Sequence, residues 1–138
     1  MDYQMLDQMG FFRESQIGRR EEIKLLNLSK CFGREGYRDT IDFVNKEKLS
    51  KYKNNGVKIS TTYSDRLYSW DSKKYDDSCK KVWNNVGQFF RQRCENPEKI
   101  QEFLSLYFDK KCELLAVVTT ENRSTGYPVS CFYYVETE

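Results

Sequence analysis

Glu113-Leu-Leu-Ala-Val-Val-Thr-Thr120 and Val129-Ser-Cys-Phe-Tyr-Tyr-Val135 are the two runs of sequence that decide the fold. Both runs are rich in β-branched and aromatic residues, which favour strands. The residues between them, 121–128, include Gly126 and Pro128, as is typical of a turn between two strands. The sequence therefore predicts a C-terminal β-hairpin whose loop is longer than a two-residue turn.

An amphipathic helix is expected some way before this hairpin. Its apolar residues recur at spacings of three and four, which places them on one face: Cys79, Val82, Trp83, Val86 and Phe90. Acidic residues suit the start of a helix. We therefore expect this helix to begin near Asp76 and Asp77 and to end near Cys94.

A second amphipathic helix is expected between the first one and the hairpin. Asn96 is a good N-cap residue, and Pro97 suits the first helical position because that position needs no amide donor. The apolar stripe then continues over residues 100–108. The two helices should pack together, with Trp83 and Phe103 in the core, where truncation to Ala would cost about 3–5 kcal/mol.

The preceding part of the chain gives weaker patterns. Asp39 and Asp42 lie before an apolar series and predict a helix from about Thr40 to Lys53, which Asn54-Asn55-Gly56 would end. Alternation over Val57–Tyr63 predicts a strand, which Arg66–Trp70 would continue or pair with. Two further helical stretches are expected at residues 3–12 and 21–32.

These elements together predict one α+β domain over residues 1–138, with several helices, an amphipathic helix pair and a small antiparallel sheet that contains the hairpin. In outline, the helix pair and hairpin resemble a winged helix. The DNA-reading helix of that fold would be Pro97–Asp109, yet it carries Glu98, Glu102 and Asp109 outward. That charge pattern argues against the usual docking on DNA phosphates.

The composition suggests a cytoplasmic protein. The net charge is +2, no apolar run approaches the ~20 residues that cross a bilayer, and Asp2 and Asp7 stand where a signal peptide needs positive charge. We therefore expect no membrane association. The five cysteines are an odd number and scattered, so we expect reduced thiols: Cys31, Cys79, Cys94, Cys112 and Cys131.

The sequence offers little support for catalysis. It contains no histidine, which excludes Ser-His-Asp and Cys-His sites within the chain. No close cysteine pair predicts zinc, and Gly33 to Gly36 lacks the phosphate-loop pattern. Acidic pairs such as Asp76 with Asp77 are interpreted as helix caps. We expect no enzyme activity, no cofactor and no metal.

Two surfaces are the candidate partner-binding sites. One is a helix face of cations and amides opposite the apolar stripe: Lys80, Lys81, Asn84, Asn85, Gln88, Arg91 and Gln92. The other is an aromatic segment: Tyr63, Tyr68, Trp70 and Tyr75. Tyr and Trp are enriched in interface hot spots. The structural alternatives are a merely solvated helix face and a loop that covers the sheet.

The leading hypothesis is a non-enzymatic binding or regulatory module that acts stoichiometrically on a protein or nucleoprotein partner. By analogy with other small, charge-dense proteins, a phage or mobile-element inhibitor of a host defence system is one such role. The alternatives are a nucleic-acid-binding protein that uses the basic helix face and, more distantly, a cofactor-free enzyme. A homodimer formed by edge pairing of the hairpin stays open.

Overall fold

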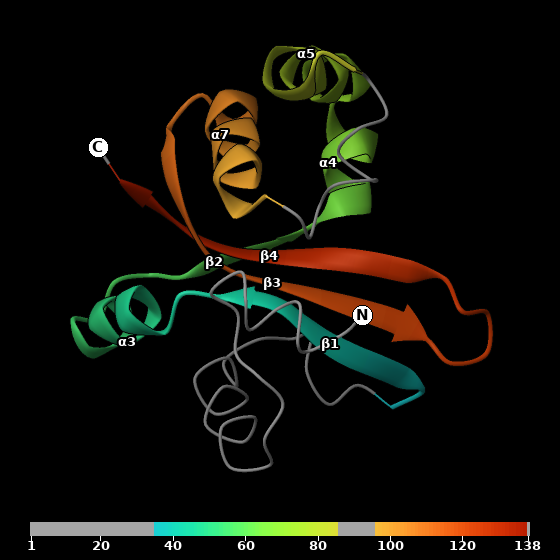
Figure 1. Cartoon of the computed structure of the whole chain (residues 1–138), viewed down its shortest axis with the longest axis horizontal. Coiled ribbons are helices and arrows are strands. Elements are labelled where there is room, and N and C mark those ends of the chain that lie inside the picture. Colours follow the sequence, from blue (N-terminus) through green and yellow to red (C-terminus); the bar gives the residue numbers. More distant parts are fainter. Residues whose placement is uncertain (1–34, 86–95, 138) are drawn as a thin grey trace.

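A four-stranded antiparallel sheet forms the centre of the computed structural model, which describes residues 35–85 and 96–137 (Figure 1). The strands are β1 (Tyr37–Val44), β2 (Ser60–Tyr63), β3 (Lys111–Asn122) and β4 (Pro128–Thr137), in the order β1-β3-β4-β2. The predicted hairpin is β3 and β4, which pair from Lys111 with Thr137 to Glu121 with Pro128. The α+β prediction is thus confirmed, although the described sheet has four strands where a winged helix has a two-stranded wing.

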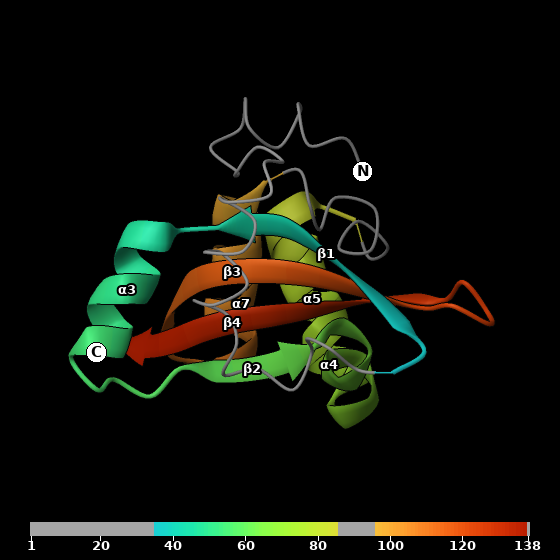
Figure 2. The same cartoon turned by 90° about the horizontal axis from the view of Figure 1, so that it is seen from below.

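Three helices lie over one face of this sheet, and a fourth lies at one end of it (Figures 1 and 2). The three are α4 (Ser64–Trp70), α5 (Ser72–Trp83) and α7 (Pro97–Phe108), and the fourth is α3 (Lys46–Asn54). The predicted helix pair is α5 with α7. Phe103 is fully buried, and its ring lies 5.9 Å from that of half-buried Trp83 and 5.4 Å from that of Tyr75.

The sheet buries apolar side chains on both faces. The core between helices and sheet includes Leu67, Cys79, Phe103, Val117 and Phe132. A second cluster lies on the opposite face and includes residues from β1, α3, β3 and β4: Ile41, Val44, Leu49, Leu115, Ala116, Val118, Cys131, Tyr133 and Val135. The alternate residues of the two hairpin strands therefore supply both cores.

Several predicted boundaries are confirmed. Asn96 caps α7 by accepting a hydrogen bond from the Lys99 N–H at 3.2 Å, and Pro97 occupies the first helical position. Asn55 ends α3 and is followed by Gly56 at φ +70°, a left-handed conformation that glycine adopts without steric cost. The apolar stripe of α7 is buried as expected.

The helix predicted over Thr40–Lys53 is wrong in its first half. Residues Tyr37–Val44 form β1, and α3 begins only at Lys46, with Asn45 rather than Asp39 or Asp42 as its N-cap. A register shift between Ile41 and Phe43 breaks the alternation of β1, which makes its apolar spacing look helical. Asp42 instead accepts a hydrogen bond from the Thr119 hydroxyl.

Three other boundaries and one element type differ from the prediction. The strand expected over Val57–Tyr63 is confined to Ser60–Tyr63, and Arg66–Trp70 is helical in α4 rather than a strand. The helix expected to begin near Asp76 begins at Ser72. It ends at Trp83, because Asn84 adopts a left-handed conformation (φ 56°), not near Cys94. The helical stretches predicted at 3–12 and 21–32 lie outside the described residues.

The expectation that all five cysteines are reduced is also wrong. Cys131, which is fully buried in β4, is disulfide-bonded. Cys79 and Cys112 form no disulfide. Burial raises the pKa of the Cys112 thiol to about 11, so this thiol stays protonated and is a poor nucleophile at neutral pH.

Candidate functional site

The structure describes only part of the basic helix face predicted from sequence. Lys80 and Lys81 are exposed on the last turn of α5, and Asn84 is exposed as the C-cap of this helix. Helix α5 ends at Trp83, so of the predicted face only Lys80 and Lys81 lie within this helix. Gln88 and Arg91 lie outside the described residues.

The aromatic segment predicted as a contact surface divides into exposed and buried members. Tyr75 is 1 % exposed and belongs to the core, so its assignment to a contact surface is wrong. Tyr63 is half-buried, and the Arg66 guanidinium lies over its ring at 5.2 Å. Tyr68 and Trp70 are 49 % and 60 % exposed. The segment is therefore a short helix with two exposed aromatic side chains.

We call three of the exposed side chains of this helix, Arg66, Tyr68 and Trp70, the α4 surface. Arg66 and Trp70 are four residues apart and share one side of the helix. Tyr68 lies on another side, where its ring packs edge-to-face with that of Tyr75 at a centroid distance of 5.4 Å. Of the seven residues in α4, only Ser64 and Leu67 are buried. Most of the circumference of α4 thus remains accessible.

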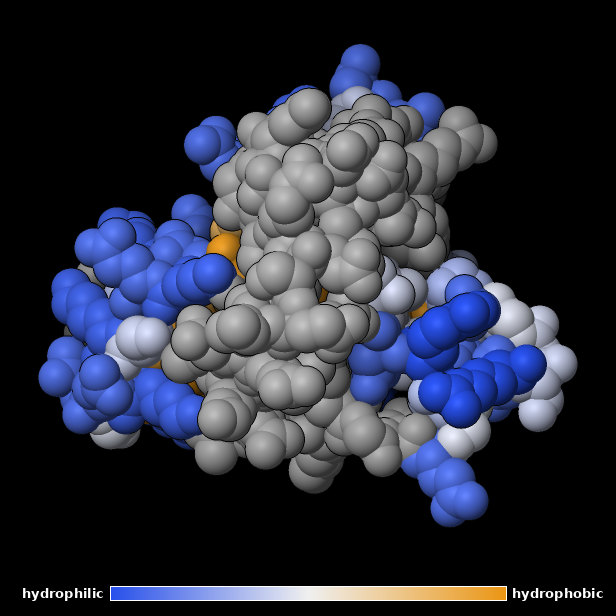
Figure 3. Space-filling view, turned by 60° about the horizontal axis from the view of Figure 1, so that its bottom comes forward, coloured by the Kyte–Doolittle hydropathy of each residue, from blue (hydrophilic) through white to orange (hydrophobic). Residues whose placement is uncertain are grey.

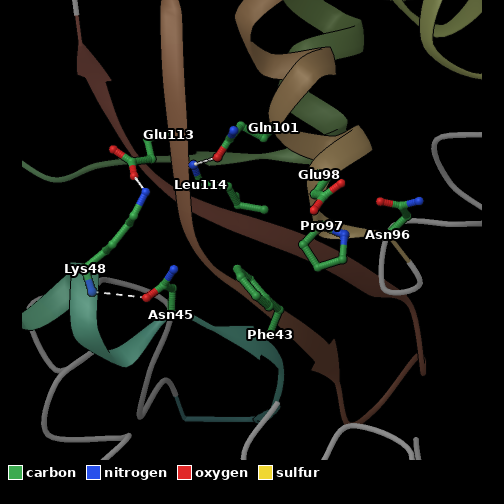
Figure 4. Close-up of a pocket in the computed structure, with 9 residues that line it drawn as sticks. All are labelled: Phe43, Asn45, Lys48, Asn96, Pro97, Glu98, Gln101, Glu113 and Leu114. Carbon is green, nitrogen blue, oxygen red and sulfur yellow. Dashed lines mark hydrogen bonds and ion pairs between the residues drawn. The ribbon is translucent and has the colours of Figure 1, made fainter. Parts of the chain in front are cut away.

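A second candidate site is a hollow of about 590 Å³ between the first turns of α3 and α7, which we call the α3–α7 hollow (Figure 4). Its lining residues come from β1, α3, α7 and β3: Phe43, Asn45, Lys48, Asn96, Pro97, Glu98, Gln101, Glu113 and Leu114. Small-molecule sites commonly have volumes of roughly 300–1,000 Å³ and combine apolar walls with a few polar groups. This hollow has both properties.

An ion pair closes one side of the α3–α7 hollow. Glu113 accepts hydrogen bonds from the Lys48 ammonium on one carboxylate oxygen and from the Tyr52 hydroxyl on the other. Burial opposes ionisation of Glu113, but the bonds from Lys48 and Tyr52 outweigh it and lower the pKa of this carboxyl. The same bonds raise the pKa of Lys48 and of Tyr52.

This ion pair is not arranged as an acid–base catalyst. A general base needs a pKa near neutrality and a lone pair directed at the substrate. Glu113 has a lowered pKa and both oxygens already accept hydrogen bonds. Its chemistry is therefore that of a fixed negative charge that orients Lys48.

No family model, curated protein or solved structure is significantly similar to this chain. The two candidate sites accordingly rest on their own geometry. Among the described residues, no group of three or more acidic or cysteine side chains could hold a metal ion. No helix in that part of the chain combines the length and apolar character needed to cross a bilayer.

Sequence reasoning missed the α3–α7 hollow. Lys48 and Glu113 are 65 positions apart, and no local motif links them. Asn96 and Pro97 were recognised, but as helix-start signals alone. The sequence does hold one feature of this area, the lysine-rich residues 46–58 in and after α3, and hydrophilic side chains cover that end of the molecule, at the left of Figure 3.

Proposed function

We propose that this protein is a non-enzymatic binding module that acts stoichiometrically on a protein partner, with the α4 surface as its anchor. The observation that carries the proposal is the exposure of Trp70 and Tyr68 on one seven-residue helix. Large aromatic side chains are costly to leave in water and dominate interface hot spots. An inhibitor of a host defence system, of phage or mobile-element origin, is one role of this type.

The charges around the α4 surface favour a protein over a nucleic acid. Five cations and four acids are interspersed from the start of α4 to the end of α5: Arg66, Lys73, Lys74, Lys80 and Lys81 against Asp65, Asp71, Asp76 and Asp77. Phosphate binding needs a surface dominated by cations. A nearly balanced surface with exposed aromatic groups is better suited to a protein with mixed charge.

Nucleic-acid binding is a second candidate, favoured by a different region. Residues 46–58 contain five lysines and one acidic residue: Lys46, Lys48, Lys51, Lys53 and Lys58 against Glu47. Such a cluster can hold phosphates. Its affinity would fall linearly on a log–log plot against salt, whereas an aromatic-anchored contact would depend on salt much less.

Capture from the native host with three matched baits tests the proposal. We expect the parent protein and Tyr127→Ala to retain a partner after nuclease treatment, and Trp70→Ala to lose it. Tyr127 is a fair control because it is 63 % exposed and lies beyond α4, in the β3–β4 loop. With the purified partner, Trp70→Ala should weaken binding by about thirtyfold, the effect of a hot-spot residue worth about 2 kcal/mol.

Two results would contradict this function. Loss of every partner after nuclease treatment would favour nucleic-acid binding through the lysine-rich region. Equal retention of the partner by Trp70→Ala and Tyr127→Ala would exclude the α4 surface as the anchor. Thermal melts of both variants check that neither substitution affects binding through unfolding, because exposed substitutions should change stability by no more than about 0.5 kcal/mol.

A further inference from the structure

Three amide side chains in the α3–α7 hollow have their oxygens engaged and their nitrogens available. Asn45 and Asn96 accept from the backbone N–H groups of Lys48 and Lys99 as helix caps, and Gln101 accepts from the Leu114 N–H at 2.9 Å. An amide whose oxygen is fixed in this way must present its NH₂ group elsewhere. Within the described residues, none of these three NH₂ groups has a hydrogen-bond partner. Those of Asn45 and Gln101 are therefore available as donors at the hollow, whereas that of Asn96 points away from Pro97 (Figure 4).

Opposite charges mark the two sides of the hollow. Lys48 lies on one side, where Glu113 orients its ammonium, and its side chain is still 49 % exposed, so further donor capacity faces solvent. Glu98 lies on the other side, in the first turn of α7, and is exposed (Figure 4). The lining thus combines one cation with two carboxylates, which disfavours a simple anion and favours a ligand that carries both charges.

The space between the two charged sides is apolar. Leu114 is buried and Phe43 half-buried, and both lie between Lys48 and Glu98 in Figure 4, with Pro97 beside Glu98. A ligand that spans the hollow would therefore place an apolar body on these side chains. An α-amino acid carries its two charges on adjacent groups, whereas a dipeptide separates them along its chain. The dipeptide therefore better matches charges on opposite sides of the hollow.

We propose that the α3–α7 hollow binds a short zwitterionic peptide. The carboxylate of the peptide pairs with Lys48 and the nearby amide NH₂ groups of Asn45 and Gln101. The ammonium group pairs with Glu98, and an apolar side chain packs on Phe43 and Leu114. This site is separate from the α4 surface, so it stands or falls independently of the proposed protein partner.

Amide chemical shifts of the ¹⁵N-labelled full chain test this site, with Gly-Phe, Gly-Leu and Gly-Val as probes. We expect saturable shifts at Lys48, Gln101 and Leu114 for at least one dipeptide. The N-acetylated dipeptide lacks the ammonium and the C-terminal amide lacks the carboxylate. Each should bind about tenfold more weakly, because a hydrogen-bonded charge pair is worth about 1.5 kcal/mol.

Matched variants assign each charge to its residue. Glu98→Gln should weaken the free dipeptide about tenfold but leave the N-acetylated one unchanged, since the ammonium is then already missing. Lys48→Met should likewise affect only ligands with a free carboxylate. Lys58→Met is the control, because this exposed lysine does not line the hollow.

Several outcomes would overturn the proposal. Absence of saturable shifts for all three dipeptides would exclude a peptide site. Shifts located outside the hollow would place binding elsewhere. Equal affinity for the free, acetylated and amidated forms would show that charge recognition is absent. An equal loss of affinity in Lys58→Met and Lys48→Met would show that Lys48 has no specific role.

Discussion

Glu113 illustrates how one residue can organise a site without reacting. It is held by two residues of the same helix, Lys48 and Tyr52, which are four positions apart and therefore share a face. Beside it, the backbone N–H of Asn45 donates to the carbonyl of Leu115 at 2.8 Å. These contacts fix the start of α3 against β3, so the same carboxylate secures the fold and shapes the hollow.

Replacing Glu113 with Gln should lower the stability of the protein at neutral pH by about 1 kcal/mol, because two hydrogen bonds to a charged group are weakened. The lowered pKa of Glu113 means that its stabilisation is complete above its ordinary value of 4.5 and is lost as the pH falls through the lowered value. The raised pKa of Lys48 means that its contribution is complete below 10.5 and is lost at higher pH.

Urea unfolding of the parent and Glu113→Gln between pH 3 and 8 measures this effect. The two stabilities should converge as the solution becomes acidic. Glu136→Gln is the control, because Glu136 pairs with Lys110 in an exposed ion pair at 3.2 Å, which should contribute little. A pH-independent difference between the parent and Glu113→Gln would show that the ion pair is not the source of the stability.

At the scale of elements, the sequence predicted a helix start correctly where only one nearby residue could act as the N-cap. Asn96 followed by Pro97 allowed one interpretation, and α7 begins there. Around α5, however, Asp71, Asp76 and Asp77 could each have been a cap. The deciding residue is Tyr75, which joins Cys79 on the buried face of the helix and so moves its start back to Ser72. Burial of Tyr75 depends on α7, and the sequence alone does not reveal that contact.

Two alanine substitutions distinguish the helix starts. Asp71→Ala should destabilise the protein by about 1 kcal/mol, because its side chain accepts a hydrogen bond from the Lys74 N–H at 3.0 Å. Asp76→Ala lies inside α5, where alanine is the best helix former, and should change stability by less than about 0.5 kcal/mol. Chemical denaturation measures both. A larger loss for Asp76→Ala would restore the helix start predicted from sequence.

At the scale of the whole molecule, the hairpin could be predicted because its strands are neighbours in sequence. The outer strands could not, since β1 pairs with β3 and β2 pairs with β4 across long separations. β1 shows the difficulty: Ile41 and Val44 are buried three residues apart, and only the shifted register against β3 makes that spacing compatible with a strand. The two candidate sites depend on the same long-range arrangement.

The number of free thiols is a property of the whole molecule on which the sequence prediction and the structure disagree. Scattered cysteines predicted five reduced thiols, whereas Cys131 is disulfide-bonded within the buried cluster on the sheet face opposite α7. One disulfide uses two of the five cysteines, so reaction with a thiol reagent in denaturant without reductant should find three thiols. Five thiols in protein alkylated at the moment of cell lysis would support the prediction of a fully reduced protein and favour a reducing compartment. Three thiols under the same quench would mean that the disulfide forms before purification. The partner would then have to occur in a compartment whose redox environment permits this disulfide.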